Sequence, residues 1–89
     1  MSCKIKISSK AEKCLTKIPK NALTKINTKI MLLADNPRIG GYKKFQGLSD
    51  LYRIRVGHYR IVYTILDKEK LILIESIQDR KDVYKRLRN

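Results

Sequence analysis

Hydrophobic and polar residues alternate along residues 51–56 and 59–63, on either side of the dipeptide Gly57-His58. Alternation of this kind is typical of strands with one buried face, and a Gly-X pair between them favours a two-residue hairpin turn. Such a turn fixes the register and places Arg55 opposite Arg60. Because side chains alternate between the two faces of a strand, one face of the hairpin is apolar and the other is basic. The apolar face consists of Tyr52, Ile54, Val56, Tyr59, Ile61 and Tyr63, and the basic face of Arg53, Arg55 and Arg60.

Apolar residues at helical spacing predict two helices before this hairpin. The first begins at Ser9-Lys10-Ala11-Glu12, which has the form of a capping box. Pro19 ends this helix or opens the second one, which stops by Asp35-Asn36-Pro37. The two helices are expected to form an antiparallel hairpin whose apolar stripes pack against another layer. The stripes consist of Ala11, Cys14, Leu15 and Ile18 in the first helix and Leu23, Ile26, Ile30 and Leu33 in the second.

Shorter elements complete the chain. Residues 4–7 alternate and predict a first strand, and residues 71–77 predict a third long strand after the hairpin. Residues 38–50 show neither period and are expected to form a structured connection. A short final helix is expected with Asp79 as its cap. These elements predict a single α+β domain over residues 1–89, with two N-terminal helices packed on one face of a small antiparallel β-sheet and a short C-terminal helix.

The charged turn before the third strand sets the expected register of that strand. If Asp67 pairs with Lys70, Glu75 lies opposite Val62 and diagonal to Arg60. The simplest role of Glu75 is then a salt bridge that orients Arg60, and the alternative is a catalytic base. By the same register, Ile72, Ile74 and Ser76 fall on the apolar face, and Leu73, Glu75 and Ile77 on the arginine face.

The composition indicates a partner with negative charge. Lysine and arginine outnumber aspartate and glutamate by 21 to 8, which gives a net charge of +13 and is typical of proteins that bind polyanions. The sequence has no apolar run long enough to span a membrane and no signal peptide, so we expect no membrane partner and a cytoplasmic location. Cys3, Cys14 and the single histidine, His58, do not have the spacing of metal ligands, and we expect neither a metal nor another cofactor.

The basic face of the hairpin suggests how a polyanion binds. Arg55 and Arg60, directly opposite each other, repel, and a bound anion relieves that repulsion. The planar fork of a guanidinium group matches the oxygens of a phosphate. The alternative is a solvated sheet face whose charges only keep the protein soluble.

Three segments carry a resemblance to a known family: Gln46-Gly47-Leu48, residues 51–63 with the pair Tyr59-Arg60, and Asp79-Arg80-Lys81-Asp82-Val83-Tyr84. In these segments, and over essentially its whole length, the chain resembles the RelE toxins of type II toxin–antitoxin pairs, within the larger RelE/ParE superfamily. The resemblance implies a metal-independent endoribonuclease that enters the A site of the 30S ribosomal subunit, cuts the bound mRNA and so inhibits translation. It also implies a cognate RelB-like antitoxin that wraps the toxin and holds it inactive.

The same resemblance assigns roles to individual residues. Arg53 and Arg55 stand where basic strand residues bind the RNA backbone, and Arg60 stands where an arginine stabilises the transition-state phosphate. Arg80 is the candidate for the basic residue before the final helix, and Tyr84 matches the C-terminal tyrosine. Further contacts to RNA are expected from Lys43, Lys44, His58, Lys81 and Arg86.

Ribonuclease chemistry suits a cluster of arginines. RNA supplies its own nucleophile, the 2′-hydroxyl, and guanidinium groups align it with the adjacent phosphorus and neutralise the charge that develops there. Tyr84 acts as the base only if nearby arginines lower its pKa from the usual value of about 10; otherwise it stacks on a nucleobase or forms a hydrogen bond. By resemblance, the products are a 2′,3′-cyclic phosphate and a 5′-hydroxyl.

Two other functions are compatible with the sequence. A ParE-like toxin that inhibits DNA gyrase binds protein instead of cutting RNA, and the combination of the three hairpin arginines with Tyr84 favours the nuclease over it. A basic nucleic-acid-binding protein without catalysis needs only the positive charge. In such a protein, Tyr84→Phe changes nothing.

Overall fold

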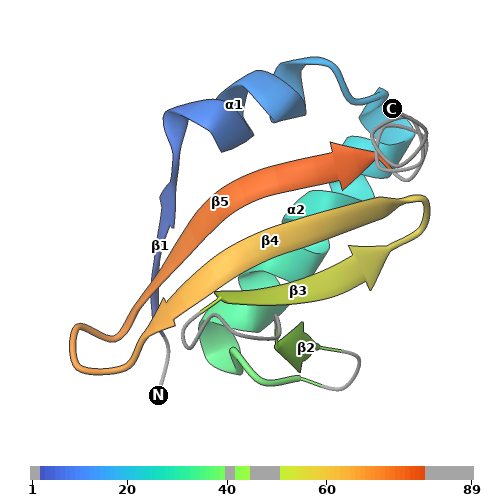
Figure 1. The fold of residues 1–89 in the computed structure, drawn as a ribbon. Helices are drawn as coiled ribbons and strands as arrows, with labels where there is room; N and C mark the ends of the chain where they lie inside the picture. Colours follow the sequence, from blue (N-terminus) through green and yellow to red (C-terminus); the bar gives the residue numbers. More distant parts are fainter. Residues whose placement is uncertain (1–2, 40–41, 45–50, 80–89) are drawn as a thin grey trace, which may run out of the picture.

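The computed structural model describes residues 3–39, 42–44 and 51–79 of the chain. Within these ranges it has helices and strands in the α+β arrangement predicted above (Figure 1). The predicted helix after Asp79 lies outside the described residues, and Asp79 itself is the last residue of a strand. The helices are α1 (Ser9–Thr16) and α2 (Lys20–Asp35), and the strands are β1 (Lys4–Ile7), β2 (Lys43–Lys44), β3 (Leu51–Val56), β4 (Tyr59–Leu66) and β5 (Leu71–Asp79).

The described strands form one mixed sheet in the order β1-β5-β4-β3-β2. The prediction of an antiparallel sheet is correct for β2 to β5 and wrong for β1, which runs parallel to β5. The exception arises because β1 lies beside the last strand and leads directly into α1, which itself packs on β5. Lys43 and Lys44, expected in an irregular connection, pair with β3 as an edge strand.

The β3–β4 hairpin has the predicted register. Arg55 lies opposite Arg60, and Ile54 lies opposite Ile61. Gly57 has a φ of +60°, as a glycine at the first position of a type II′ turn requires. The local sequence therefore determines which side chains of this hairpin share a face.

The pairing of β4 with β5 contains a β-bulge that the alternation of β5 did not predict. Between Val62 and Tyr63 the register shifts by one residue, so Val62 faces Ser76 and Glu75 becomes the extra residue of β5. Because a bulge reverses the alternation beyond it, Ile77 points into the core and Ser76 belongs to the arginine face, the reverse of the prediction. Burial of Ile77, which is only 5% exposed, favours this arrangement.

Both helices bury their apolar stripes on one face of the sheet, as predicted. Figure 1 shows α2 crossing behind the sheet and α1 beside β5. The helical residues Ala11, Ile26, Ile30 and Leu33 form one core with the sheet residues Ile54, Ile61, Tyr63, Ile65, Ile72, Ile74 and Ile77. The cap of α1 is Ser8 and not the predicted Ser9: the Ser8 hydroxyl accepts the amide N–H of Ala11 and donates to the carbonyl of Glu75. This side chain therefore ties the start of α1 to the bulge in β5.

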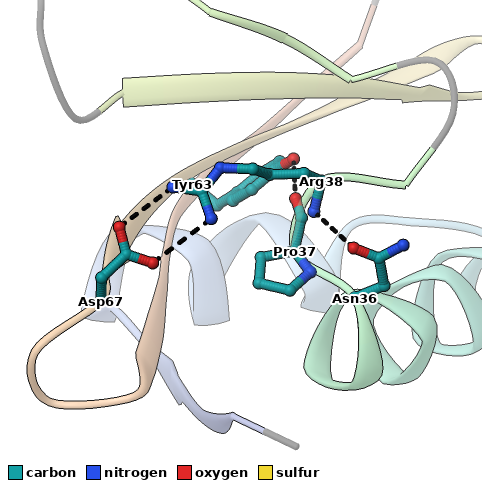
Figure 2. A network of polar contacts seen from close by, with 5 residues as sticks. All are labelled: Asn36, Pro37, Arg38, Tyr63 and Asp67. Carbon is teal, nitrogen blue, oxygen red and sulfur yellow. Dashed lines mark hydrogen bonds and ion pairs between the residues drawn. The ribbon is translucent and has the colours of Figure 1, made fainter. Parts of the chain in front are cut away.

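A cluster of polar contacts fixes the chain where it leaves α2 (Figure 2). Arg38 donates two hydrogen bonds to the carboxylate of Asp67, at 3.0 and 3.3 Å, and its guanidinium carbon lies 6.0 Å from the centre of the Tyr52 ring. The hydroxyl of buried Tyr63 donates to the carbonyl oxygen of Pro37 at 3.0 Å. Burial raises the pKa of Tyr63 to about 12, so this hydroxyl remains a donor at neutral pH. We call Arg38, Asp67, Tyr63 and Pro37 the brace.

Three further observations concern the described ranges alone. No helix there is both long and apolar enough to cross a membrane. Cys3 and Cys14 are free and partly buried. No three histidine, cysteine or acidic side chains of the described residues gather into a group that could hold a metal ion.

Candidate functional site

The three hairpin arginines gather on the face of the sheet that α1 and α2 do not cover. Arg55 and Arg60 are direct partners across β3 and β4, and Arg53 lies opposite Val62 on the same face. Directly opposed residues of antiparallel strands have Cβ atoms only about 5 Å apart. Arg53 and Arg60 are partly buried, whereas Arg55 is exposed. We call the side of the sheet that carries these three residues the arginine face.

The electrostatics of Arg60 reflect this crowding. Its pKa is lowered, first by burial and then by the positive charges of Arg53 and Arg55. An arginine nevertheless stays protonated at any pH that the protein meets, so the effect is a repulsion that the folded protein must sustain. A phosphate bound between the three groups would relieve that repulsion and be held by charge-assisted hydrogen bonds.

One partner of Arg60 is a residue that the sequence analysis missed. Both Nε and Nη2 of Arg60 donate to Oε1 of Gln78, at 3.1 and 2.6 Å. The prediction that Glu75 orients Arg60 is wrong: Glu75 accepts a long hydrogen bond from the Thr64 hydroxyl, at 3.4 Å, and the bulge places Gln78 opposite Arg60. The spacing of the β5 isoleucines, two residues from Ile72 to Ile74 and three from there to Ile77, was the available signal.

The lysines and the histidine predicted to bind RNA are distributed over both faces and the hairpin tip. Lys43 lies opposite Arg53 and so extends the arginine face, whereas Lys44 lies opposite Tyr52 and belongs to the other face. His58 is exposed in the turn that joins β3 to β4, the two strands that carry the arginines. The remaining predicted residues, Arg80, Lys81, Tyr84 and Arg86, lie outside the described part of the chain.

Two further lysines belong to the arginine face and were not predicted as site residues. Lys4 and Lys6 of β1 lie opposite Leu71 and Leu73, whose side chains point to that face, and both lysines are exposed. Positive charge therefore extends from β1 at one edge of the sheet to β2 at the other. A surface of this width can follow a nucleic-acid backbone over more than one phosphate.

A groove of about 420 Å³ lies elsewhere, on the side of the sheet that the helices cover. Its walls include Tyr59 and Ile77, whose side chains point away from the arginines. This groove is therefore a separate feature from the arginine face. The groove is lined by Lys10, Lys13, Cys14, Lys17, Ile18, Tyr59, Ile77 and Asp79.

Comparison with known proteins gives the family. Residues 5–84 match the model of the ParE toxin of type II toxin–antitoxin systems, parDE. The protein RelE1 of Methanocaldococcus jannaschii, named as a toxin, is 30% identical over 88 residues, which cover 96% of this chain and 98% of that protein.

Solved structures agree with this result. The archaeal RelE–RelB complex from Pyrococcus horikoshii OT3 superposes with a TM-score of 0.80 at 29% identity, over 90% of this chain and 97% of that one. The isolated E. coli RelE toxin has the same fold, with a TM-score of 0.78 at 21% identity over 97% and 99% of the two chains. The protein is therefore a RelE-like toxin of the RelE/ParE family of type II toxin–antitoxin systems.

Proposed function

We propose that this toxin is a metal-independent endoribonuclease that enters the ribosomal A site, cuts the bound mRNA and thereby inhibits translation. The observation that carries the proposal is the arginine face: three guanidinium groups on adjacent strands of one hairpin, on a face that the helices leave uncovered. Repulsion between neighbouring guanidinium groups is expected of a phosphate-binding surface when no phosphate is bound.

The arginines supply alignment and charge neutralisation, because the RNA itself supplies the nucleophile. The 2′-oxygen forms a bond to phosphorus while the bond from phosphorus to the 5′-oxygen breaks, which leaves a 2′,3′-cyclic phosphate and a 5′-hydroxyl. One proton leaves the 2′-hydroxyl and one is taken up by the 5′-oxygen. In this proposal Arg53 and Arg55 hold the backbone, and Arg60 binds the non-bridging oxygens as their charge increases.

The remaining roles in this proposal follow from the resemblance to RelE toxins. Arg80 adds positive charge near the scissile phosphate, and Tyr84 stacks on a nucleobase and helps to orient the RNA. Lys43, Lys81 and Arg86 would contact the backbone on either side of the cut.

Two partners follow from this proposal. The first is a cognate antitoxin, because the related RelE proteins of P. horikoshii and M. jannaschii were solved as complexes with RelB. A segment that covers the arginine face should be acidic, since a net charge of +13 attracts an oppositely charged surface. The second partner is the 30S subunit with its mRNA, which puts the site of action in the cytoplasm.

Purified protein added to ribosomes that carry a defined mRNA tests the nuclease directly. We expect cuts in the message at the A site, about 10²- to 10³-fold slower with Arg60→Ala and measurably slower with Tyr84→Phe. Arg38→Ala is the matched control, because it removes an arginine that lies away from the arginine face, and it should cut as the wild type does. An intact message with wild-type protein would refute the proposal.

The family model that matches the chain describes a ParE toxin, and this favours a second candidate, a toxin that inhibits DNA gyrase. Such a toxin would use the basic surface to bind protein or DNA without cutting RNA. The same preparation added to a gyrase supercoiling reaction separates the two functions. Loss of supercoiling together with an intact message would establish the gyrase inhibitor.

A further inference from the structure

Gln78 is an uncharged side chain of the arginine face that contacts Arg60, the arginine whose pKa is lowered. Oε1 of Gln78 accepts hydrogen bonds from Nε and Nη2 of Arg60, at 3.1 and 2.6 Å. Both donors lie on one edge of the guanidinium group, so the single oxygen fixes the plane of the group as well as its position. Two partly buried side chains from adjacent strands thus form one rigid unit.

Arg60 needs such a partner because its neighbours repel it. The charges of Arg53 and Arg55 would turn its long, flexible side chain away from the centre of the face. The acceptor on β5, on the side away from β3, holds the guanidinium group against that repulsion. The cluster is therefore assembled before any phosphate binds.

An amide suits this task better than a carboxylate does. A carboxylate at the same place would neutralise Arg60 and compete with phosphate for it, whereas a neutral oxygen leaves the positive charge intact. The contact with Gln78 uses the Nε–Nη2 edge of the group, so the second hydrogen of Nη2 and both hydrogens of Nη1 point away from Gln78.

The β-bulge is what brings Gln78 to this face. Without the extra residue Glu75, strict alternation along β5 would point Gln78 into the core side and leave Ile77 among the arginines. The bulge is itself held by the Ser8 hydroxyl, which donates to the carbonyl of Glu75 at 2.7 Å. The bulge in β5 therefore determines which side chain of that strand contacts Arg60.

We propose that Gln78 is a positioning residue that holds the Arg60 guanidinium group in the orientation required to bind the scissile phosphate. The inference rests on the proposed nuclease function. It adds a residue that touches no reacting atom and acts only through Arg60.

The test compares Gln78→Met, which keeps the length of the side chain and removes the acceptor, with wild type in single-turnover cleavage of ribosome-bound mRNA. We expect the maximal rate to fall about 10- to 100-fold, because a misplaced catalytic group loses most of its alignment. The toxin concentration at half-maximal rate should stay within about twofold, since charge and therefore ribosome affinity are unchanged. Thr64→Val, which removes a different side-chain hydrogen bond between β4 and β5, is the matched control and should cut at the wild-type rate.

Two further variants separate positioning from a general effect on folding. In an Arg60→Ala background, adding Gln78→Met should lower the residual rate by less than about twofold, because a residue that acts through Arg60 has nothing left to position. Gln78→Glu keeps an acceptor and adds a negative charge. It should keep the Arg60 Nε proton protected from exchange in NMR spectra, as in wild type, but still cut more slowly than wild type.

The outcomes distinguish this inference from the function on which it rests. Wild-type protein that leaves the message intact overturns both. Wild-type cleavage with an equally fast Gln78→Met variant overturns only the role of Gln78. A further loss of rate from Gln78→Met in the Arg60→Ala background also overturns it, because Gln78 would then act independently of Arg60.

Discussion

Arg38 in the brace and Arg60 on the arginine face have opposite electrostatic environments within one small sheet. Arg38 donates to a carboxylate, that of Asp67, which raises its pKa further. Arg60 donates to a neutral amide beside two other arginines, and its pKa is lowered. A guanidinium group paired with a carboxylate has its charge offset within the protein itself. A neutral amide does not offset the charge of the guanidinium group, and the proposed nuclease function requires that charge at Arg60.

The comparison predicts its largest effect for the pair Arg60→Ala and Arg38→Ala. The first should lower cleavage of ribosome-bound mRNA by about 10²- to 10³-fold while the free energy of unfolding stays the same or rises, since a repulsion is removed. The second should change neither rate nor cut sites. Rates on programmed ribosomes, together with urea denaturation of both variants, check this. A large loss of stability in Arg60→Ala would mean that Arg60 is structural after all.

Arg55→Ala should give the next largest effect, because Arg55 is the exposed member of the arginine face. We expect about a tenfold weaker complex with single-stranded RNA at low salt. The slope of log affinity against log salt concentration should become shallower by about 0.7, the value for one lost phosphate contact. Titrations at several salt concentrations measure both quantities. An unchanged slope would show that Arg55 is only a solvated residue.

Tyr63→Phe tests the brace. The Tyr63 side chain is 0% exposed, and its hydroxyl donates to the carbonyl of Pro37. Removing the hydroxyl leaves that carbonyl without this donor, which should cost about 1–2 kcal/mol of stability. Thermal or urea unfolding measures this cost, and the cleavage rate at a temperature where both proteins are folded should not change. Slower cleavage by the folded variant would contradict the separation of the brace from the arginine face.

The β3–β4 hairpin could be predicted residue by residue, because its turn and its alternation are local features of the sequence. The stripes of α1 and α2 could be predicted for the same reason. The pairing of β1 with β5 could not, since it depends on packing between segments far apart in the chain. The start of α1 was wrong by one residue, because Ser8 and Ser9 are equally good caps and only the contact of Ser8 with β5 distinguishes them.

The candidate site shows the same division between local and distant information. Arg53, Arg55 and Arg60 lie together as the hairpin pattern predicted. Gln78 was missed because uninterrupted alternation was assumed along β5. In the structure, Glu75 is left out of the pairing between β4 and β5, and the resulting bulge allows Ile77 to be buried. A prediction based on strict alternation cannot include such a bulge, because the bulge depends on the gain from burying Ile77 and not on the local pattern.

Asp67→Asn should give the smallest effect and tests how little an exposed ion pair contributes. Arg38 lowers the pKa of Asp67 below its ordinary value of 3.8, so the folded state favours the charged carboxylate. The stabilisation is present above that ordinary pKa and is lost as the pH falls through the lowered one. Wild type should therefore unfold at a slightly higher temperature than Asp67→Asn at pH 7, and the difference should vanish in strong acid.

Because both partners are exposed, at 43% and 69% for Arg38 and Asp67, added salt should shrink the difference at pH 7. Glu69→Gln removes a charge from the same turn without touching this ion pair, and it should show neither dependence. A difference between wild type and Asp67→Asn that persists in strong acid would assign the stability to packing of the side chain instead of its charge.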